Sequence, residues 1–150
     1  MMLFWIVVMG VLYALMTYAL KPKQAKVLAN GDLVLQRARD GHFYAPGTVN
    51  GQEVVFLVDT GASMVAVSDE LAQKAMLPPG TPMTFNTANG AMPGRLVKGV
   101  RLAVGPIVVT NAKVGVGLRG MAADQALLGQ SFLSKFDVLI NKESLTLRPR

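Results

Sequence analysis

The sequence predicts an all-β domain, a small barrel or sandwich with one short helix, preceded by an N-terminal transmembrane helix. Three observations lead to this class. From residue 27 onward, short segments rich in Val, Thr and Phe alternate with turn dipeptides, as the strands of a small β-fold do. One helical segment interrupts them. Residues 1–20 contain no charged side chain and no histidine, and about 20 apolar residues cross a bilayer as a helix.

Residues 1–20 are therefore interpreted as an uncleaved membrane anchor. Trp5 and Tyr18 lie near its two ends, where aromatic side chains favour the membrane interface. A cleaved signal peptide would have a basic start and a small-x-small cleavage site, and neither is evident. A buried core helix would show a polar face. Residues 21–26 are expected to be a linker, and residues 27–150 the folded domain.

The strands are expected between turn signals. Asn30-Gly31, Asn50-Gly51 and Asn89-Gly90 are hairpin-turn dipeptides, and Gly105-Pro106 is a further break. The segments between and after them are rich in β-formers. The expected strands cover residues 42–49, 53–58, 82–88, 95–104, 107–116, 137–140 and 144–147.

One helix is expected over residues 68–76. Ser68 is a suitable N-cap, and Asp69 and Glu70 complement the positive end of the helix dipole. A shorter helical turn is expected around residues 132–135, after Gly129. No long repeat or low-complexity tract is present.

The composition excludes several kinds of site. The chain has no cysteine and a single histidine, His42, which excludes disulfides, thiolate catalysis and a multi-histidine metal site within one chain. The formal charge is +6, but the basic residues are scattered and form no stripe interleaved with aromatics. We expect no metal, no cofactor and no nucleic-acid partner, and interpret His42 as structural. A Ser63–His42–Asp40 triad lacks any serine-hydrolase signature.

Asp59 ends the apolar run "FLV" and is followed by Thr60 and Gly61. A carboxylate at the end of an apolar strand loses contacts with water, which is costly unless nearby donors compensate. Gly61 permits a positive φ and lets backbone N–H groups approach the carboxylate. The alternative is a surface turn, because Asp, Thr and Gly all favour turns. The tripeptide by itself favours this alternative.

Three ordered motifs, "FLVDTGASMVAVS" (residues 56–68), "TANG" (87–90) and "LLGQSFL" (127–133), together resemble the retropepsin-like aspartic proteases. The chain is most similar to the bacterial group in which a membrane segment precedes one protease domain. "GHFYAPGTVNG" (residues 41–51) resembles that group's lead-in strand and turn. The resemblance covers roughly residues 27–150. It implies a closed β-barrel-like domain, a polypeptide substrate, and two copies for one active site.

The resemblance assigns roles to the catalytic turn. Asp59 matches the catalytic aspartate, and Thr60 the threonine whose hydroxyl braces the paired turns across the dimer. Gly61 matches the glycine that shapes the turn and helps hold the substrate backbone. Ala62 matches the retroviral type of loop. Ser63 departs from it, since an acidic residue that contacts the substrate often stands there.

Two further elements follow from the resemblance. Thr87, Ala88, Asn89 and Gly90 fall where the family has its flap, a hairpin that closes over the substrate; an ordinary exposed hairpin would show the same turn signal. Leu127, Leu128 and Gly129 match the element packed beneath the catalytic turn. Leu127 and Leu128 are interpreted as core, and Gly129 as a close approach of backbone.

Carboxylate catalysis of peptide hydrolysis supplies the reason for a dimer. One group takes a proton from water while another gives one to the carbonyl oxygen, and two adjacent carboxylates share a proton. The chain holds one Asp-Thr-Gly among its nine acidic residues. The partner carboxylate is therefore expected to be Asp59 of a second copy across a two-fold axis.

The resulting hypothesis is a membrane-tethered, homodimeric aspartic endopeptidase that hydrolyses peptide bonds through a water activated by two Asp59 carboxylates. The alternative is a catalytically silent, membrane-anchored peptide-binding or assembly module with the same fold, because fold does not imply function. A two-lobed sugar-kinase-type ATPase is set aside, because about 125 residues are too few for two sizeable lobes.

Two observations give opposite indications of the orientation of the anchor. Lys21, Lys23 and Lys26 flank the apolar run on its C-terminal side, which by the positive-inside rule places the domain in the cytoplasm. The resemblance to membrane-anchored bacterial relatives favours the periplasm. We expect a single-pass protein of the bacterial inner membrane whose domain faces the periplasm or envelope, with the cytoplasmic side left open.

Overall fold

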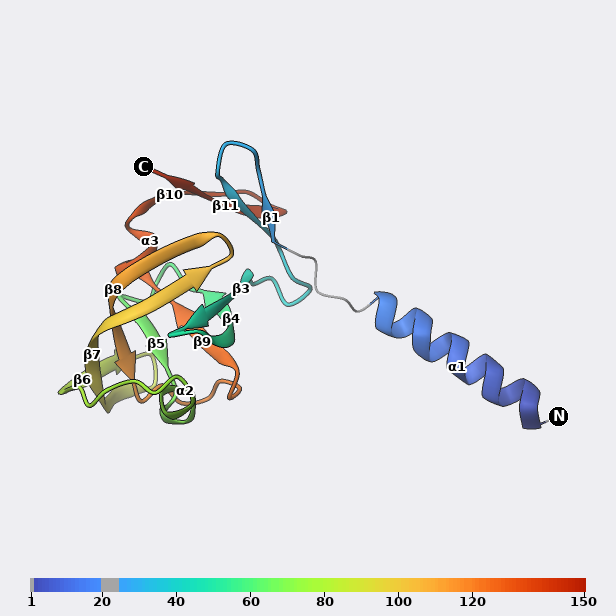
Figure 1. Cartoon of the computed structure of the whole chain (residues 1–150), viewed down its shortest axis with the longest axis horizontal. Helices are drawn as coiled ribbons and strands as arrows, with labels where there is room; N and C mark the ends of the chain where they lie inside the picture. The colour runs from blue at the N-terminus through green and yellow to red at the C-terminus, as the bar shows by residue number, and fades with distance from the viewer. Residues whose placement is uncertain (1, 20–24) are drawn as a thin grey trace.

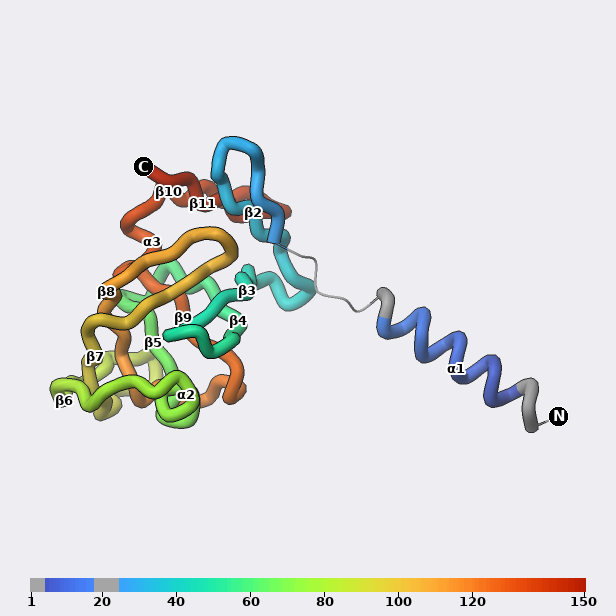
Figure 2. The backbone as a smooth tube through the Cα atoms, in the orientation of Figure 1, coloured from blue at the N-terminus to red at the C-terminus, as the bar shows by residue number. Residues whose placement is uncertain are grey.

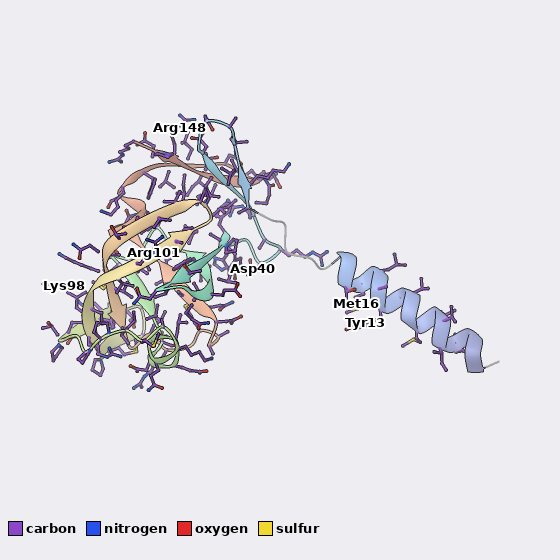
Figure 3. The ribbon with its side chains drawn as sticks, viewed as in Figure 1. Tyr13, Met16, Asp40, Lys98, Arg101 and Arg148 are labelled. Carbon is purple, nitrogen blue, oxygen red and sulfur yellow. The ribbon has the colours of Figure 1, made fainter. Side chains whose placement is uncertain are left out.

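A computed structural model describes residues 2–19 and 25–150. The N-terminal helix α1 (Met2–Ala19) lies apart from a β-rich body that contains the other elements (Figure 1). Most of its described apolar side chains, among them Tyr13 and Met16, are exposed to solvent (Figure 3).

The helix expected near the N-terminus is present, but the membrane span expected there is not supported. Within residues 2–19 and 25–150, no helix combines the length and the hydropathy that crossing a membrane requires. Met1 and residues 20–24, with most of the expected linker, lie outside the described residues. The last linker residue, Lys26, begins strand β1.

The larger sheet has seven strands in the order β3-β4-β9-β5-β8-β7-β6. Strand β3 also pairs with β7, so that six strands close into a barrel and β6 extends beyond it (Figures 1 and 2). This confirms the predicted all-β barrel. The strands are β3 (Tyr44–Val49), β4 (Gln52–Val58), β5 (Val65–Val67), β6 (Thr81–Thr87), β7 (Gly90–Val104), β8 (Ile107–Val116) and β9 (Gln125–Leu128).

A second, four-stranded sheet has the order β1-β2-β11-β10. Its strands are β1 (Lys26–Val27), β2 (Leu33–Gln36), β10 (Phe136–Ile140) and β11 (Ser144–Pro149). The two ends of the domain therefore meet in one sheet, with β11 between β2 and β10. One continuous apolar core joins this sheet to the barrel and includes Leu33, Leu145 and Phe56, all fully buried.

Asp32, directly before β2, is the one buried charged residue in the described part of the chain. Its carboxylate accepts hydrogen bonds from Nε and Nη2 of Arg148, each at 3.3 Å (Arg148 is labelled in Figure 3). Without Arg148 this carboxylate would be buried and unpaired, which is strongly unfavourable.

The turns follow the predicted chemistry in part. Asn50 and Gly51 have φ of 48° and 84° and close the β3–β4 hairpin, as a two-residue turn of this type requires. The β6–β7 turn differs from the prediction. Thr87 pairs with Gly90, so the turn residues are Ala88 and Asn89 rather than Asn89 and Gly90.

Both predicted helices form with shifted bounds. Helix α2 (Asp69–Lys74) starts after Ser68, whose hydroxyl accepts a 3.1 Å hydrogen bond from the amide of Leu71, as an N-cap does. It ends before residue 76 because Met76 adopts a φ of 50°, which stops a helix. Helix α3 (Gln130–Leu133) starts two residues earlier than expected, directly after Gly129.

Candidate active site

Asp59 directly follows strand β4, where the strand leaves the barrel. Its amide donates a 3.1 Å hydrogen bond to the carbonyl of Leu128 and thereby continues the parallel pairing of β4 with β9. In the single chain the Asp59 side chain is exposed. In one copy the Asp59 carboxylate therefore keeps its contacts with water, contrary to the expectation. It would lose them only when a second copy or a substrate covers it.

Gly61 holds the carboxylate, although not in the predicted conformation. Its amide donates a 2.8 Å hydrogen bond to Oδ1 of Asp59, as predicted for this turn. Its φ is not positive, so the predicted left-handed conformation is wrong. A Cβ at this position would lie 3.3 Å from Asp59 Oδ1. Glycine at position 61 therefore allows the backbone amide and the Asp59 carboxylate to approach each other closely.

Gly129 lies against the far side of the catalytic turn. A Cβ at this position would overlap the carbonyl oxygen of Met64 and would lie 2.7 Å from that of Ala62. This confirms the predicted close approach of backbone. Of the two supporting leucines, Leu128 is fully buried as predicted, whereas Leu127 is only half-buried because it projects from the other face of strand β9.

Gln130 and Ser131, which the sequence interpretation did not single out, fasten the same turn. The amide of Gln130 donates to the Ala62 carbonyl at 2.8 Å, and its side-chain Nε2 donates to the Thr60 carbonyl at 2.9 Å. The amide of Ser131 donates to the Ser63 carbonyl at 3.1 Å. These bonds hold the catalytic loop from Thr60 to Ser63 in place. The Thr60 side chain itself is exposed.

A cleft of about 340 Å³ opens beside Asp59 and Thr60. Of the described residues that line it, Asp59 alone carries a carboxylate. His42, interpreted as structural from the sequence, is at the wall of this cleft. The lining residues are Arg37, Gly41, His42, Phe43, Leu57, Val58, Asp59, Thr60, Ile140 and Leu145.

Arg37 fixes one wall of the cleft. Its guanidinium donates to the carbonyl of Gly41 at 2.7 Å, of Lys142 at 2.8 Å and of Asn141 at 3.1 Å. It also lies over the ring of Phe43, 4.4 Å from the ring centroid, in a cation–π arrangement. Arg37 thus joins the loop before β3 to the β10–β11 turn. A single basic residue in the sequence gives no sign of such distant partners.

The loop that carries His42 is held by Asp40 (labelled in Figure 3). Asp40 accepts hydrogen bonds from the Tyr44 hydroxyl at 2.6 Å and from the His42 amide at 3.0 Å. The Tyr44 bond, followed by the amide bond, lowers the pKa of Asp40 below its ordinary value, and the same bond raises the pKa of Tyr44. Asp40 is thus occupied by Tyr44, and Ser63 does not line the cleft. No serine triad is assembled.

The expected flap residues form the tip of the β6–β7 hairpin. Thr87 Oγ1 donates to the Gly90 carbonyl at 2.8 Å and accepts from the Asn89 amide at 3.2 Å. None of Thr87, Ala88, Asn89 and Gly90 lines the cleft beside Asp59. The hairpin is linked to the catalytic loop indirectly. Phe85 of β6 and Met64 both fill the space left by Gly115, which lacks a side chain.

The described residues contain no group of three or more His, Cys, Asp or Glu side chains arranged to hold a metal ion. One chain therefore presents a single carboxylate, fixed by a backbone amide, in a cleft whose other polar side chains are those of Arg37, His42 and Thr60. General acid–base hydrolysis by carboxylates requires a second such group.

Comparison with known proteins gives one matching family and a similar solved structure. Residues 45–135 match the model of the family described as gag-polyprotein putative aspartyl protease. A crystal structure of a retropepsin-like aspartic protease from Rickettsia conorii is 36% identical in sequence, with a TM-score of 0.66. The match covers 78% of this chain and 89% of that one.

Two curated bacterial proteins are also similar. An uncharacterized protein encoded in the cobV 5′ region of Sinorhizobium sp is 36% identical over 135 residues, 85% of this chain and 58% of the relative. An uncharacterized protein of Rickettsia prowazekii (strain Madrid E) is 35% identical over 125 residues, 78% of this chain and 51% of the relative. The chain thus spans little more than half the length of these relatives.

Proposed function

The chain belongs to the retropepsin-like aspartic proteases, and on that basis we propose that it is an endopeptidase in which two copies form one active site. The observation that carries the proposal is the single carboxylate of the cleft, Asp59, held by the Gly61 amide at 2.8 Å. A carboxylate held in a fixed position suits a catalytic role. Because one chain supplies only one such carboxylate to the cleft, a site formed by two copies around a two-fold axis would supply the second.

In the proposed mechanism one Asp59 is ionised and its counterpart in the second copy is protonated. The ionised carboxylate takes a proton from water as the water oxygen attacks the peptide carbonyl carbon. The protonated carboxylate gives its proton to the carbonyl oxygen. Collapse of the resulting diol breaks the C–N bond: the departing nitrogen takes a proton from one carboxyl group, and a diol hydroxyl returns a proton to the other carboxylate, which restores the shared proton. One shared proton is needed throughout, so the rate falls at both pH extremes.

Other residues have supporting roles in this proposal. Thr60, Gly61, Ala62 and Ser63 form the active-site turn, with the Thr60 hydroxyl bracing the two turns across the dimer axis. Residues 87–90 act as the flap that closes over the polypeptide substrate. Because the flap lies outside the cleft in one copy, its contribution is expected only with substrate bound and the second copy present.

Asp59→Asn tests the mechanism. The side chain stays nearly isosteric, but it cannot act as a general base. The full chain in detergent is expected to lose all cleavage of a denatured protein between about pH 3 and 8, a range that brackets split carboxylate titrations. Asp124→Asn, an exposed carboxylate outside the cleft, is the matched control and is expected to keep wild-type cleavage.

Two outcomes would contradict the proposal. If Asp59→Asn cleaves as fast as the wild type, the aspartic mechanism is wrong. If neither protein cleaves any substrate, while both bind peptides, the chain is a peptide-binding or assembly module with the protease fold.

We further propose that residues 1–20 attach the protein to the bacterial inner membrane, with the domain on the periplasmic side. The support is the absence of charge in this segment and the exposed apolar side chains of α1. The full chain is expected to sediment with membranes until detergent is added, and a reporter fused after Arg150 to be active only in the periplasm. Release by salt alone, or activity only in the cytoplasm, contradicts the respective part.

A further inference from the structure

The chain contains three Asn-Gly dipeptides, and the fold holds them with different strength. An Asn-Gly pair can modify itself, because the glycine amide nitrogen can attack the side-chain carbonyl carbon of the asparagine. Glycine has no Cβ to hinder this approach, and its backbone adopts conformations that other residues do not. All six residues are exposed, so access of water does not distinguish the pairs. They are Asn30-Gly31, Asn50-Gly51 and Asn89-Gly90.

Two of the asparagines are held by hydrogen bonds to their side chains. Oδ1 of Asn50 accepts a 2.9 Å bond from the amide of Arg101, and the Asn50 amide donates a 2.8 Å bond to the Arg101 carbonyl. Oδ1 of Asn30 accepts a 3.1 Å bond from the amide of Asp32. The amide of Gly31, the attacking nitrogen of that pair, donates to a backbone carbonyl at 2.9 Å. In both pairs these bonds must break before the reacting atoms can meet.

Asn89 is held less firmly. Its backbone amide donates a 3.2 Å bond to Oγ1 of Thr87, but its side chain forms no hydrogen bond or ion pair with any residue that the structure describes. Gly90 pairs with Thr87 in the last pair of the β6–β7 ladder, and β6 is the edge strand of the larger sheet (Figure 1). The end of such a ladder opens more readily than its interior. A small local opening therefore lets the Asn89 side chain and the Gly90 amide meet.

We propose that Asn89-Gly90 is a site of spontaneous covalent modification, which converts Asn89 to aspartate and isoaspartate. The Gly90 nitrogen forms a bond to Cγ of Asn89 and gives up its proton. The bond between Cγ and Nδ2 breaks, and Nδ2 leaves as ammonia with that proton. Water then opens the cyclic imide at either carbonyl carbon, which gives aspartate in one case and isoaspartate in the other. The reaction consumes water and needs no oxidant and no enzyme.

The modification is expected to impair the proposed flap as the protein ages. Both products carry a carboxylate in place of a neutral amide, and isoaspartate also lengthens the main chain of the turn by a methylene group. A flap that closes over the Asp59 pair would bring the new carboxylate toward groups that already share a negative charge, and like charges repel. This consequence rests on the proposed function, whereas the modification itself does not.

Peptide mapping of the aged protein tests the site. The full chain is kept in detergent at neutral pH for several days, and samples are digested and analysed by mass spectrometry, with labelling by an isoaspartyl methyltransferase. Asn89 is expected to be converted about tenfold faster than Asn50 or Asn30, the factor that about 1.4 kcal/mol in an activation barrier produces. The two slower pairs are matched controls, because they have the same dipeptide in the same molecule.

The same experiment in concentrated urea separates the fold from the local sequence. Unfolding removes the bonds that hold Asn50 and Asn30, so the three pairs are expected to be converted at similar rates. If Asn89 is ahead by the same factor in urea, its neighbours in the sequence explain the difference and the inference from the hydrogen bonds is wrong.

Asn89→Gln tests the effect on the flap, because the longer side chain keeps an amide but cyclises far more slowly. The cleavage rate of each aged sample is divided by the rate of the same protein when fresh. The wild type is expected to lose cleavage in proportion to the converted fraction, whereas Asn89→Gln loses none by this route. Asn30→Gln, verified as folded by circular dichroism, is the control and is expected to age like the wild type.

The outcomes separate this inference from the proposed function. If Asn89 in the folded chain is converted no faster than Asn50 and Asn30, the modification site is wrong and the protease proposal stands. If Asn89 is converted as expected but the aged protein cleaves as fast as the fresh one, the site stands and the effect on the flap is wrong. If Asn89 is converted and no fresh sample cleaves any peptide, the site stands and the protease proposal falls.

Discussion

At the scale of single residues, the catalytic turn depends on the absence of a side chain at Gly129. The turn from Thr60 to Ser63 is held by backbone carbonyls that accept hydrogen bonds from the start of α3. These bonds require the catalytic turn and the start of α3 to lie so close together that a Cβ at residue 129 would overlap the turn. The glycine thus sets the position of Asp59 without touching the substrate.

Gly129→Ala is expected to destabilise the domain by about 2 kcal/mol, the usual cost of an added methyl in a packed site, and to reduce cleavage by displacing the turn. Urea unfolding of the full chain measures the first effect. Gly10→Ala is the matched control, because a Cβ at residue 10 meets nothing within 4 Å. Equal unfolding midpoints for wild type and Gly129→Ala would show that the loop adjusts freely.

Thr60→Ala is expected to weaken the dimer. A side-chain hydrogen bond contributes about 1 kcal/mol, and two-fold symmetry removes it twice, so about 2 kcal/mol, or a roughly 30-fold rise in the dissociation constant, should follow. Sedimentation measures it, and Thr60→Ser, which keeps the hydroxyl, should behave as wild type. Unchanged affinity and unchanged turnover in Thr60→Ala would remove the bracing role.

The sequence predicted the residues whose roles are local and missed those whose partners are distant. Asp59 and its bond from Gly61 lie within three consecutive residues, and their geometry follows from the turn. The φ of Gly61 was predicted wrongly, because the close carboxylate rather than the backbone conformation requires glycine there. Arg37 and Gln130 bind carbonyls 104 and 70 positions away, and no local pattern indicates such pairs.

At the scale of elements, the short helix α2 shows how its start is fixed. Ser68 caps it through the Leu71 amide, and Leu71 is fully buried beneath the helix. Ser68→Ala is expected to lower the free energy of unfolding by about 1 kcal/mol, while Ser68→Asp, another good cap, should not. Thermal or urea unfolding distinguishes the two. Equal losses in both variants would mean that the hydroxyl acts in some way other than capping.

Most strands bounded by turns were predicted with small shifts, but β7 starts at Gly90, before the expected start at residue 95, and the short strands were missed. Strand β8 has the predicted bounds, 107–116. Strands β5 and β9, of three and four residues, were not predicted, because so few residues carry no detectable alternation. Strands β5 and β9 pair with each other in the middle of the larger sheet. Their position is decided by long-range pairing rather than by composition.

At the scale of the whole molecule, a site made from two copies predicts a concentration dependence. Well below the dissociation constant, the cleavage rate per chain is expected to rise in proportion to protein concentration, and to level off above it. A dilution series with sedimentation on the same samples checks this. A constant rate per chain from a species shown to be monomeric would contradict the two-copy site.

The pairing of β2 with β11 also has a consequence for how the chain is made. Leu35 pairs with Leu145, 110 positions later. At about 5–20 residues per second, the ribosome adds those residues in about 5 to 20 seconds. During that interval β2 lacks its β11 partner, and the Asp32 carboxylate lacks Arg148. Completion of the domain therefore awaits the last strand, and the nascent chain is exposed to chaperones, proteases and other nascent copies in the meantime.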